Sequence, residues 1–191
     1  NRTALAPLVR RAGAVPKVFP LVADAVAETR SALVEAFRHC DVLLTSGGVS
    51  VGDMDFIRPA FQEVGGELQF WKVAIRPGRP FVFGRYAGKF LFGLPGNPAS
   101  ALVTYLLLVR PALLRWQGAT DVGLPSHPGI LAEPLANAET RRHFIRVRLD
   151  AFGKVHSAGI QGSHMLGSMA AANGLVDLPP QTTLSVGTVV Q

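Results

Sequence analysis

The sequence predicts an α/β fold: a three-layer α/β/α domain with a mainly parallel sheet, followed by a small all-β domain. Three observations predict it. Helix-like and strand-like segments alternate over residues 1–118, which is typical of a parallel sheet with helices on both faces. The composition then changes, and residues 124–128 have the character of a linker. Over residues 125–191, short β-like runs are separated by Gly and Pro, which indicates a second domain.

The first domain is expected to begin with two helices separated by a strand. Asn1 can cap the first helix, and Gly13 would end it. Residues 15–21 have the composition of a strand, and Asp24 can cap the second helix. The apolar run 41–45 suits a parallel strand, because such strands are buried on both faces.

The middle of the chain alternates loops, strands and one short helix. Residues 46–52 are a glycine-rich loop, and Asp55 can cap the helix that follows. Residues 68–75 are predicted to form a strand, and residues 76–80 a proline-rich turn. Two phenylalanine-rich runs within residues 81–92 are typical of a hairpin.

A long apolar helix is expected over residues 99–116. Arg110 and Pro111 interrupt its most apolar part, which is shorter than the ~20 residues of a membrane-spanning helix. We therefore expect no membrane association. The first residues lack the layout of a signal peptide, and the single cysteine, Cys40, excludes an internal disulfide. These features predict a cytoplasmic location.

The formal net charge of +6 favours anionic partners. The basic residues do not form a long run; the densest group is the pair Arg141-Arg142. We therefore do not expect nucleic acid as the partner. The histidines of the second domain lack the spacing of metal ligands, so no zinc site is expected there.

The glycine-rich loop is the most informative local pattern. Gly47 and Gly48 would let backbone N–H groups approach an anion, and Ser46 and Ser50 add hydroxyl donors. The helix that follows presents its positive N-terminal end. Loops at the carboxyl ends of parallel strands form the ligand crevice of such folds. The alternative is a tight strand-to-helix turn that binds no ligand.

Asp55 admits two interpretations. As a helix cap it would accept a hydrogen bond from a free N–H group in the first turn. As a Mg²⁺ ligand it would supply carboxylate oxygen beside a phosphate site, since Mg²⁺ prefers oxygen ligands and shares phosphate oxygens. The residue by itself favours the cap.

Lys72, Arg76 and Arg79 form a basic cluster. Even spacing along a strand would place Lys72 and Arg76 on the same side, and the turn at Pro77-Gly78 would bring Arg79 back towards them. Three cations repel one another unless an anion lies between them, so the cluster indicates an anion site. The alternative is a solvated turn.

A rigid turn containing Pro95 and Asn97 opens the long helix. Ser100 lies in the first turn of that helix, where N–H groups are free, so it either lines an oxyanion site or caps the helix. In the second domain, Arg146 and Ser163 are further candidates for anion contacts.

Together these sequence motifs resemble one family. Residues 45–55, 70–81 and 93–100 are similar, in order, to the molybdopterin molybdenumtransferases: the bacterial MoeA proteins, the plant molybdenum-insertion domain and the E domain of gephyrin. Residues 161–165 and 168–179 resemble the last domain of that family. The similarity covers nearly the whole chain.

The resemblance implies a Mg²⁺-dependent reaction that inserts molybdate into adenylylated molybdopterin and releases AMP. It implies catalytic roles for Asp55, Lys72 and Arg76, with Asp55 also holding the metal. The implied substrate-binding positions are Ser46, Gly47, Gly48, Ser50, Arg79, Pro95, Asn97, Ser100, Arg146 and Ser163. Five residues are candidates for a molybdate pocket: Arg76, Arg79, Ser100, Arg146 and Ser163.

Two departures from the family bear on activity. Many relatives carry Lys at the positions of Arg76 and Arg79, and guanidinium geometry differs from that of an ammonium group. The family proteins are also considerably longer, so we expect these 191 residues to bind ligand weakly and not to turn over alone. The resemblance implies a homodimer for the full-length protein.

Two alternatives stand beside the enzyme. One is a gephyrin-like scaffold that binds a partner peptide through its C-terminal domain. The other is a related pterin-adenylylating domain, which the β-like runs from Gly129 onward disfavour, because that family lacks a trailing β domain.

Overall fold

The computed structural model describes residues 1–49 and 55–191 and divides the chain into two compact units. Unit 1 contains Asn1–Val73 and Gly78–Val122, and unit 2 contains Ala74–Pro77 and Gly123–Gln191. Residues 74–77 lie within the predicted first domain, yet their short strand pairs with a strand of unit 2. Each unit is described by itself.

The sheet of unit 1 has the order β1-β5-β4-β2. Its strands are β1 (Val42–Ser46), β2 (Glu67–Trp71), β4 (Val82–Tyr86) and β5 (Lys89–Leu94). Among the described strands of this unit, β1 and β5 pair in parallel, whereas β4 pairs antiparallel with both β5 and β2. The expectation of a mainly parallel sheet is therefore wrong in this detail. The reason is the tight β4–β5 hairpin, since strands joined by a short turn run antiparallel.

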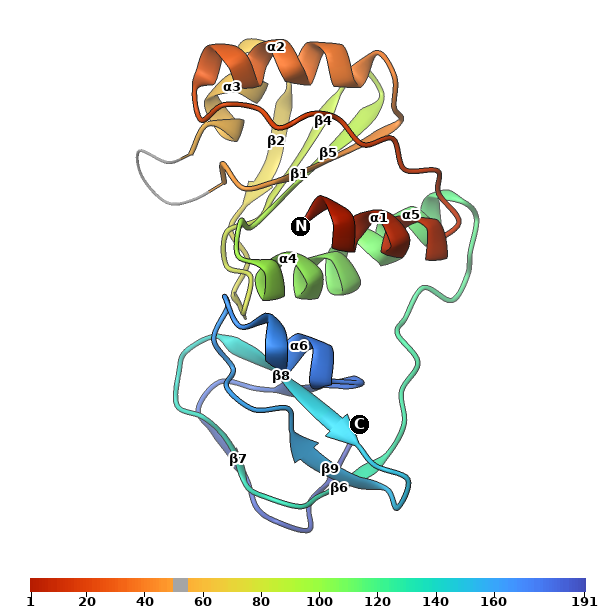
Figure 1. Cartoon of the computed structure of the whole chain (residues 1–191), viewed down its shortest axis with the longest axis vertical. Coiled ribbons are helices and arrows are strands. Elements are labelled where there is room, and N and C mark those ends of the chain that lie inside the picture. Colours follow the sequence, from red (N-terminus) through yellow and green to blue (C-terminus); the bar gives the residue numbers. More distant parts are fainter. Residues whose placement is uncertain (50–54) are drawn as a thin grey trace. The chain divides into compact units, whose positions relative to one another are not determined.

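Helices cover both faces of this sheet, which confirms the three-layer arrangement (Figure 1). Side chains alternate along each strand. Val82 and Leu91 pack with α2 (Val26–Phe37) and α3 (Ile57–Glu63). Phe81, Phe92 and Leu94 pack on the opposite face with α1 (Arg2–Arg11) and the long helical run.

That helical run is α4 (Pro98–Thr104), the π-helical segment η1 (Tyr105–Val109) and α5 (Arg110–Trp116). Pro111 has no N–H group, and its ring would clash with a carbonyl one turn earlier. The wider π turn before Pro111 is consistent with relief of that clash.

The run has 19 residues, and in the described part of the chain it is the one helix whose length and composition suffice to cross a membrane. This differs from our expectation, which counted a shorter segment. A helix packed in a protein core meets the same criterion, and Val103, Tyr105 and Val109 are fully buried in unit 1.

The predicted strand at residues 15–21 is not formed. Pro16 and Pro20 remove two backbone donors, and Val15 and Leu21 are 95% and 83% exposed. The capping prediction for Asp24 is also wrong, because Ala25 precedes α2 and no side chain caps it.

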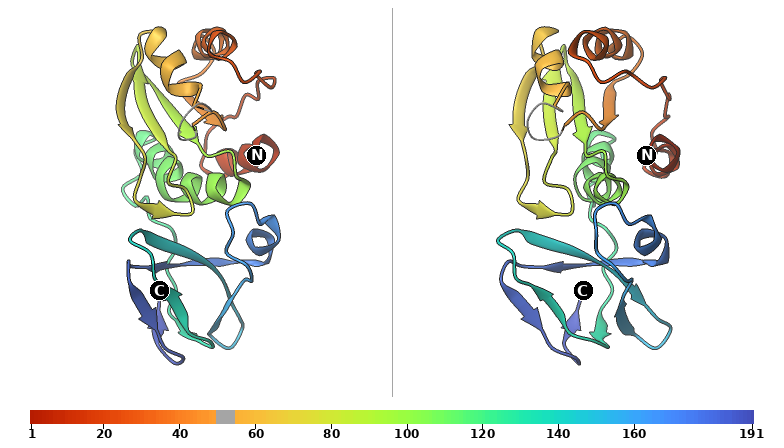
Figure 2. Two further views of the ribbon diagram at one scale, coloured as in Figure 1. Left: turned by 90° about the vertical axis from the view of Figure 1, so that its left-hand side faces the viewer. Right: turned by 60° about the vertical axis from the view of Figure 1, so that its left-hand side comes forward.

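Unit 2 is built mainly from short strands and confirms the predicted β domain. Its elements are β3 (Ile75–Arg76), β6 (Gly129–Leu131), β7 (Leu135–Asn137), β8 (Arg142–Leu149), β9 (Lys154–Ser157), α6 (Leu166–Ala171), β10 (Gly174–Leu178), β11 (Thr182–Leu184) and β12 (Val189–Val190). The larger sheet has the order β10-β8-β9-β6-β12, with β3 added in parallel to the start of β8. Figure 2 shows the strands of this unit curving around one another. Its hydrophobic core contains residues such as Leu131, Ile145, Val155 and Leu178.

Candidate functional site

The loops that follow β1 and β5 lie against each other in unit 1. Because these strands are parallel neighbours, Ser46 pairs with Leu94 and both loops leave the same edge of the sheet. The Gly47 amide donates to the Leu94 carbonyl at 3.0 Å. A Cβ atom on Gly96 would lie 3.5 Å from the Gly47 Cα, so the two backbones approach closely.

Consecutive positive φ angles give the first loop its shape. Gly47 has φ +92° and Gly48 has φ +67°, a region that side-chain-bearing residues rarely adopt. The Gly48 carbonyl accepts from the amides of Phe56 and Ile57, both at 3.0 Å, so the loop is joined to the start of α3. Ser50, a predicted ligand, lies outside the described residues.

Asn1 connects the two loops, a role that the sequence did not suggest. Its side-chain amide donates to Ser46 Oγ at 2.6 Å and to the Gly96 carbonyl at 2.8 Å. Ser46 Oγ in turn donates to the Pro95 carbonyl at 3.3 Å. The predicted side-chain cap by Asn1 is wrong: its backbone carbonyl accepts from the start of α1, while its side chain is turned to the loops.

The Asp55 carboxylate is held by Arg58. Its Oδ1 accepts from the Arg58 amide at 3.3 Å, as a capping side chain would, and its Oδ2 is paired with the Arg58 guanidinium. The Asp55 side chain is 2% exposed. Among residues 1–49 and 55–191, no group of three or more His, Cys, Asp and Glu side chains could hold a metal ion. The described side chains thus do not by themselves form a Mg²⁺ site.

Lys72 directly follows β2 in a strained backbone conformation. Its φ is +71°, and its amide donates to the Phe81 carbonyl at 2.9 Å. Its ammonium nitrogen lies 3.6 Å from the centroid of the Trp71 ring. The expected continuous strand over residues 68–75 therefore ends at Trp71.

This break changes the predicted basic cluster. Lys72 belongs to unit 1 and Arg76 to β3 in unit 2, so the two do not project from one side of a single strand. Arg79 lies in unit 1, is exposed, and accepts a hydrogen bond from the Val73 amide through its backbone carbonyl at 3.0 Å.

In unit 2, Arg76 forms an ion pair with Glu139. Arg76 Nη1 donates to Glu139 Oε1 at 2.5 Å, and Arg141 Nη2 donates to Glu139 Oε2 at 2.9 Å. Both contacts hold the pKa of Glu139 below its ordinary value, with the Arg141 hydrogen bond as the largest cause. The Glu139 carboxylate therefore forms ion pairs with two arginines.

His143 faces Arg76 across the β3–β8 pair and is 5% exposed. Burial lowers its pKa to about 4, and the charge of Arg76 adds to that shift. Its Nε2 is buried and has no hydrogen-bond partner among the described residues. The imidazole is thus neutral near pH 7.

Arg146 is fully buried at the centre of β8. Its Nε donates to Gln161 Oε1 at 3.1 Å, and both terminal nitrogens donate to the Gly162 carbonyl at 3.1 Å. Longer contacts reach the carbonyls of Ile160 and Met165. The guanidinium donors are thus directed at the loop that carries Ser163. In this arrangement Arg146 supports that loop and does not present its donors to an anion.

The remaining predicted site residues are divided between the two units. Pro95 and Ser100 are buried and Asn97 is exposed in unit 1, while Ser163 is half-buried in unit 2. The structure thus brings together the loops at 46–48 and 95–97, and separately the residues around β3 and β8.

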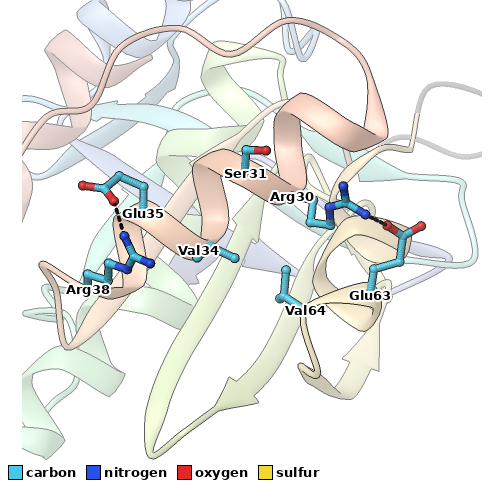
Figure 3. Close-up of a pocket in the computed structure, with 7 residues that line it drawn as sticks. All are labelled: Arg30, Ser31, Val34, Glu35, Arg38, Glu63 and Val64. Carbon is cyan, nitrogen blue, oxygen red and sulfur yellow. Dashed lines mark hydrogen bonds and ion pairs between the residues drawn. The ribbon is translucent and has the colours of Figure 1, made fainter.

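A hollow of about 430 Å³ on the outer surface of α2 and α3 lies apart from these groups. Its charges pair with one another: Arg30 lies 3.4 Å from Glu63, and Arg38 lies 3.2 Å from Glu35 (Figure 3). Because each of these arginines already has a carboxylate partner, the hollow lacks the unpaired positive charge of an anion site.

Sequence reasoning missed Arg58, Trp71, Glu139 and Gln161. The three-residue spacing of Asp55 and Arg58 was a usable signal, because a carboxylate just before a helix can accept from an N–H group of the first turn and so lies near that residue. Glu139 and Gln161 contact residues distant in the sequence, so no local pattern indicated them.

Comparison with known proteins supplies the family. The protein-family model described as "Probable molybdopterin binding domain" matches residues 1–115, and the family model described as "MoeA C-terminal region (domain IV)" matches residues 128–191. The chain belongs to the MoeA family of molybdopterin molybdenumtransferases.

Its relatives include the molybdopterin molybdenumtransferase of Haemophilus influenzae, 37% identical over 83% of this chain and 40% of that protein. Molybdopterin molybdenumtransferase 2 of Mycobacterium tuberculosis is 37% identical over 100% of this chain and 49% of that protein. A crystal structure of the molybdopterin biosynthesis MoeA protein from Pyrococcus horikoshii matches with a TM-score of 0.85 and 28% identity, over 98% of this chain and 46% of that one. This MoeA-family chain therefore spans less than half the length of these relatives.

Proposed function

We propose that the protein acts in molybdenum cofactor biosynthesis by inserting molybdate into adenylylated molybdopterin, with release of AMP. The observation that carries this proposal is the pair of glycine-containing loops at the carboxyl ends of β1 and β5. The names of the relatives, molybdopterin molybdenumtransferases, support the transferase activity. The same names give no support to the alternative of a peptide-binding scaffold.

The Gly47-Gly48 turn is proposed to receive the phosphate groups of the substrate. A Cβ atom on Gly47 would meet no atom of the described residues within 4 Å, so this backbone has space beside it in that part of the chain. The Gly47 amide donates to Leu94, so the Gly48 N–H group is the proposed donor to an anion in this space. The Lys72 ammonium adds positive charge in the same unit.

Molybdate is a small dianion with acceptor oxygens only, so charged donors and hydroxyls suit it. Arg79 and Ser100 remain proposed ligands within unit 1, and Arg76 and Ser163 are proposed, separately, as anion contacts within unit 2. Arg146 is proposed to contribute to molybdate binding indirectly, by supporting the loop that carries Ser163. Fixing molybdate beside the dithiolene would supply much of the rate enhancement. Binding then meets most of the entropy loss of bringing the two reactants together before the chemical step begins.

The Mg²⁺ requirement remains a prediction. Asp55 is paired with Arg58 in this structure, and no step of the reaction is assigned to Mg²⁺. Calorimetric titration with Mg²⁺ in the presence and absence of AMP would test it. We expect binding only with AMP, because the phosphate would supply oxygens that the described residues lack.

A pair of glycine variants tests the phosphate site. Gly47→Ala and Gly88→Ala each place a methyl group at a positive φ with no described atom within 4 Å, so the backbone strain is similar. Gly88 lies in the β4–β5 hairpin. We expect Gly47→Ala to weaken AMP binding at least about tenfold, which corresponds to ~1.4 kcal/mol, and Gly88→Ala to leave it unchanged. Equal affinities of the two variants would contradict the proposed site.

The whole reaction is a separate question, because the chain spans 40% to 49% of its relatives. We propose that these 191 residues bind AMP and molybdate without turnover. Release of AMP from adenylylated molybdopterin at the rate of a complete relative would refute this. A cytoplasmic location and a homodimeric full-length protein are proposed on the resemblance alone; fractionation and light scattering would test them.

A further inference from the structure

Trp71 lies at the centre of a charged network that includes two predicted catalytic residues. The Arg58 guanidinium carbon and the Lys72 ammonium nitrogen each lie 3.6 Å from the centroid of its ring. Arg58 is also paired with the Asp55 carboxylate. One indole therefore contacts both cations, and through Arg58 it is connected to Asp55.

The electrostatics favour this arrangement. The face of an indole is electron-rich and attracts cations more strongly than the rings of Tyr or Phe. Asp55, Arg58 and Lys72 together carry one negative and two positive charges, so the group has a net charge of +1. The attraction of both cations to the ring offsets the repulsion between Arg58 and Lys72.

Two further observations indicate that the side chains are held for a purpose other than folding. Lys72 adopts φ +71°, a conformation that is strained for a residue with a side chain. Trp71 Nε1 is buried and lacks a hydrogen-bond partner among the described residues. Such unfavourable features persist where the surrounding structure enforces them, and they gather at functional sites.

The network adjoins the glycine-rich loop. Asp55 forms a β-bridge with Val49, and the neighbouring residues Phe56 and Ile57 donate to the Gly48 carbonyl. A change in the position of Arg58 would therefore act on the segment that shapes the loop.

We propose that Trp71 is a positioning residue, whose indole holds Lys72 directly, and Asp55 through Arg58, in one arrangement beside the Gly47-Gly48 turn. Its role in ligand binding rests on the proposed function, in which Lys72 contacts anionic substrate. The contacts themselves do not depend on that function and are tested separately.

The first test uses no ligand. A double-mutant cycle combines Trp71→Leu with Lys72→Met and measures unfolding by urea. We expect the two positions to be coupled by a factor of about 2 to 5 in the unfolding equilibrium constant, the range for a cation over an aromatic face. The control cycle combines Trp116→Leu with Lys72→Met, because Trp116 packs on Phe90. Coupling no larger than in the control would overturn the proposal.

The second test measures AMP binding by calorimetry. Trp71→Leu should weaken it by about tenfold and Trp71→Phe by about threefold, because phenylalanine keeps a weaker aromatic face. Packing alone would make the loss of affinity follow the loss of stability, because Leu and Phe both fill less volume than Trp. Urea unfolding of both variants is therefore measured beside the titration, and a loss of affinity that only follows the loss of stability would overturn the positioning role. Trp116→Leu is the control for the loss of an indole, because Trp116 packs on Phe90.

The outcomes separate the two proposals. Unchanged AMP affinity in both Trp71 variants would overturn the positioning role even if the cycle shows coupling. If the wild-type chain and Gly88→Ala both fail to bind AMP, the proposed function fails, and the ligand-free cycle still decides whether Trp71 holds Lys72.

Discussion

The two units hold their basic residues in different ways. In unit 1, Lys72 and Arg58 lie over the Trp71 ring, and Arg58 also forms an ion pair with the Asp55 carboxylate. In unit 2, Arg146 is fully buried and directs its donors at Gln161 and backbone carbonyls. The Lys72 ammonium over the ring keeps N–H donors for a ligand, whereas the Arg146 guanidinium directs its donors at protein oxygens. Positive charge in a family motif thus does not by itself mark an anion ligand.

The largest effect is expected at Arg146. Arg146→Met would leave several carbonyls of the 160–165 loop without donors, so the free energy of unfolding should fall by about 3 kcal/mol. Arg146→Lys should recover little of this, because an ammonium cannot reproduce the guanidinium fork. Urea unfolding of the whole chain measures both.

Arg148→Met is the matched control for Arg146. Arg148 is exposed on the same strand, so its loss should change stability by less than about 0.5 kcal/mol. If Arg146→Lys is as stable as wild type, charge and not loop support is the role of Arg146, and the contrast between the units is lost.

The next effect concerns pH and His143. Its folded-state pKa of about 4 lies below the ordinary 6.5, so the unfolded chain takes up the proton first as pH falls. Stability should therefore be complete above pH 6.5 and fall by on the order of 2–3 kcal/mol between pH 6.5 and 4. Arg76, Arg141 and Arg146 oppose protonation, and Glu139 favours it.

His143→Leu should remove this part of the pH dependence, as measured by urea unfolding at pH 7 and pH 4.5. The carboxylates also titrate in this window, so the comparison is made against wild type and against His127→Gln, which alters an exposed histidine. The same pH dependence in His143→Leu and wild type would show that burial of His143 is not the cause.

A smaller effect is expected from the strained backbone of unit 1. Lys72→Gly and Lys72→Ala both remove the ammonium, but only glycine relieves the positive φ. Lys72→Gly should therefore be more stable than Lys72→Ala by about 1 kcal/mol, as measured by thermal unfolding. Equal stabilities would mean that Lys72 is not strained.

The smallest effect is expected at an exposed ion pair. The side chains of Arg30 and Glu63 are 52% and 48% exposed, so water screens their attraction. Arg30→Met should change the free energy of unfolding by less than about 0.5 kcal/mol. A loss approaching that of Arg146→Met would contradict the distinction between buried and exposed arginines.

Much of the fold followed from local patterns. The apolar run before the glycine-rich loop became β1, and the phenylalanine-rich runs became β4 and β5. Residues 15–21 formed no strand, since Pro16 and Pro20 remove two backbone donors. The assignment of Arg76 to unit 2 was not predictable, because β3 pairs with a strand more than sixty residues away in sequence.

The candidate site was predicted less completely. Its loops were visible in the sequence, because glycine and proline mark tight turns. The contacts of Asn1, Trp71 and Glu139 depend on tertiary placement, and the same residue types have ordinary roles elsewhere. Family motifs indicated Arg146 as an anion ligand, but they could not show where its donors point.

The most direct test of the central claim is a crystal soaked with AMP. We predict phosphate density within hydrogen-bonding distance of the Gly48 amide, beside the open face of Gly47, with Lys72 still over the Trp71 ring. Phosphate density only at exposed arginines such as Arg38 or Arg115, with the Gly47-Gly48 turn empty, would contradict it.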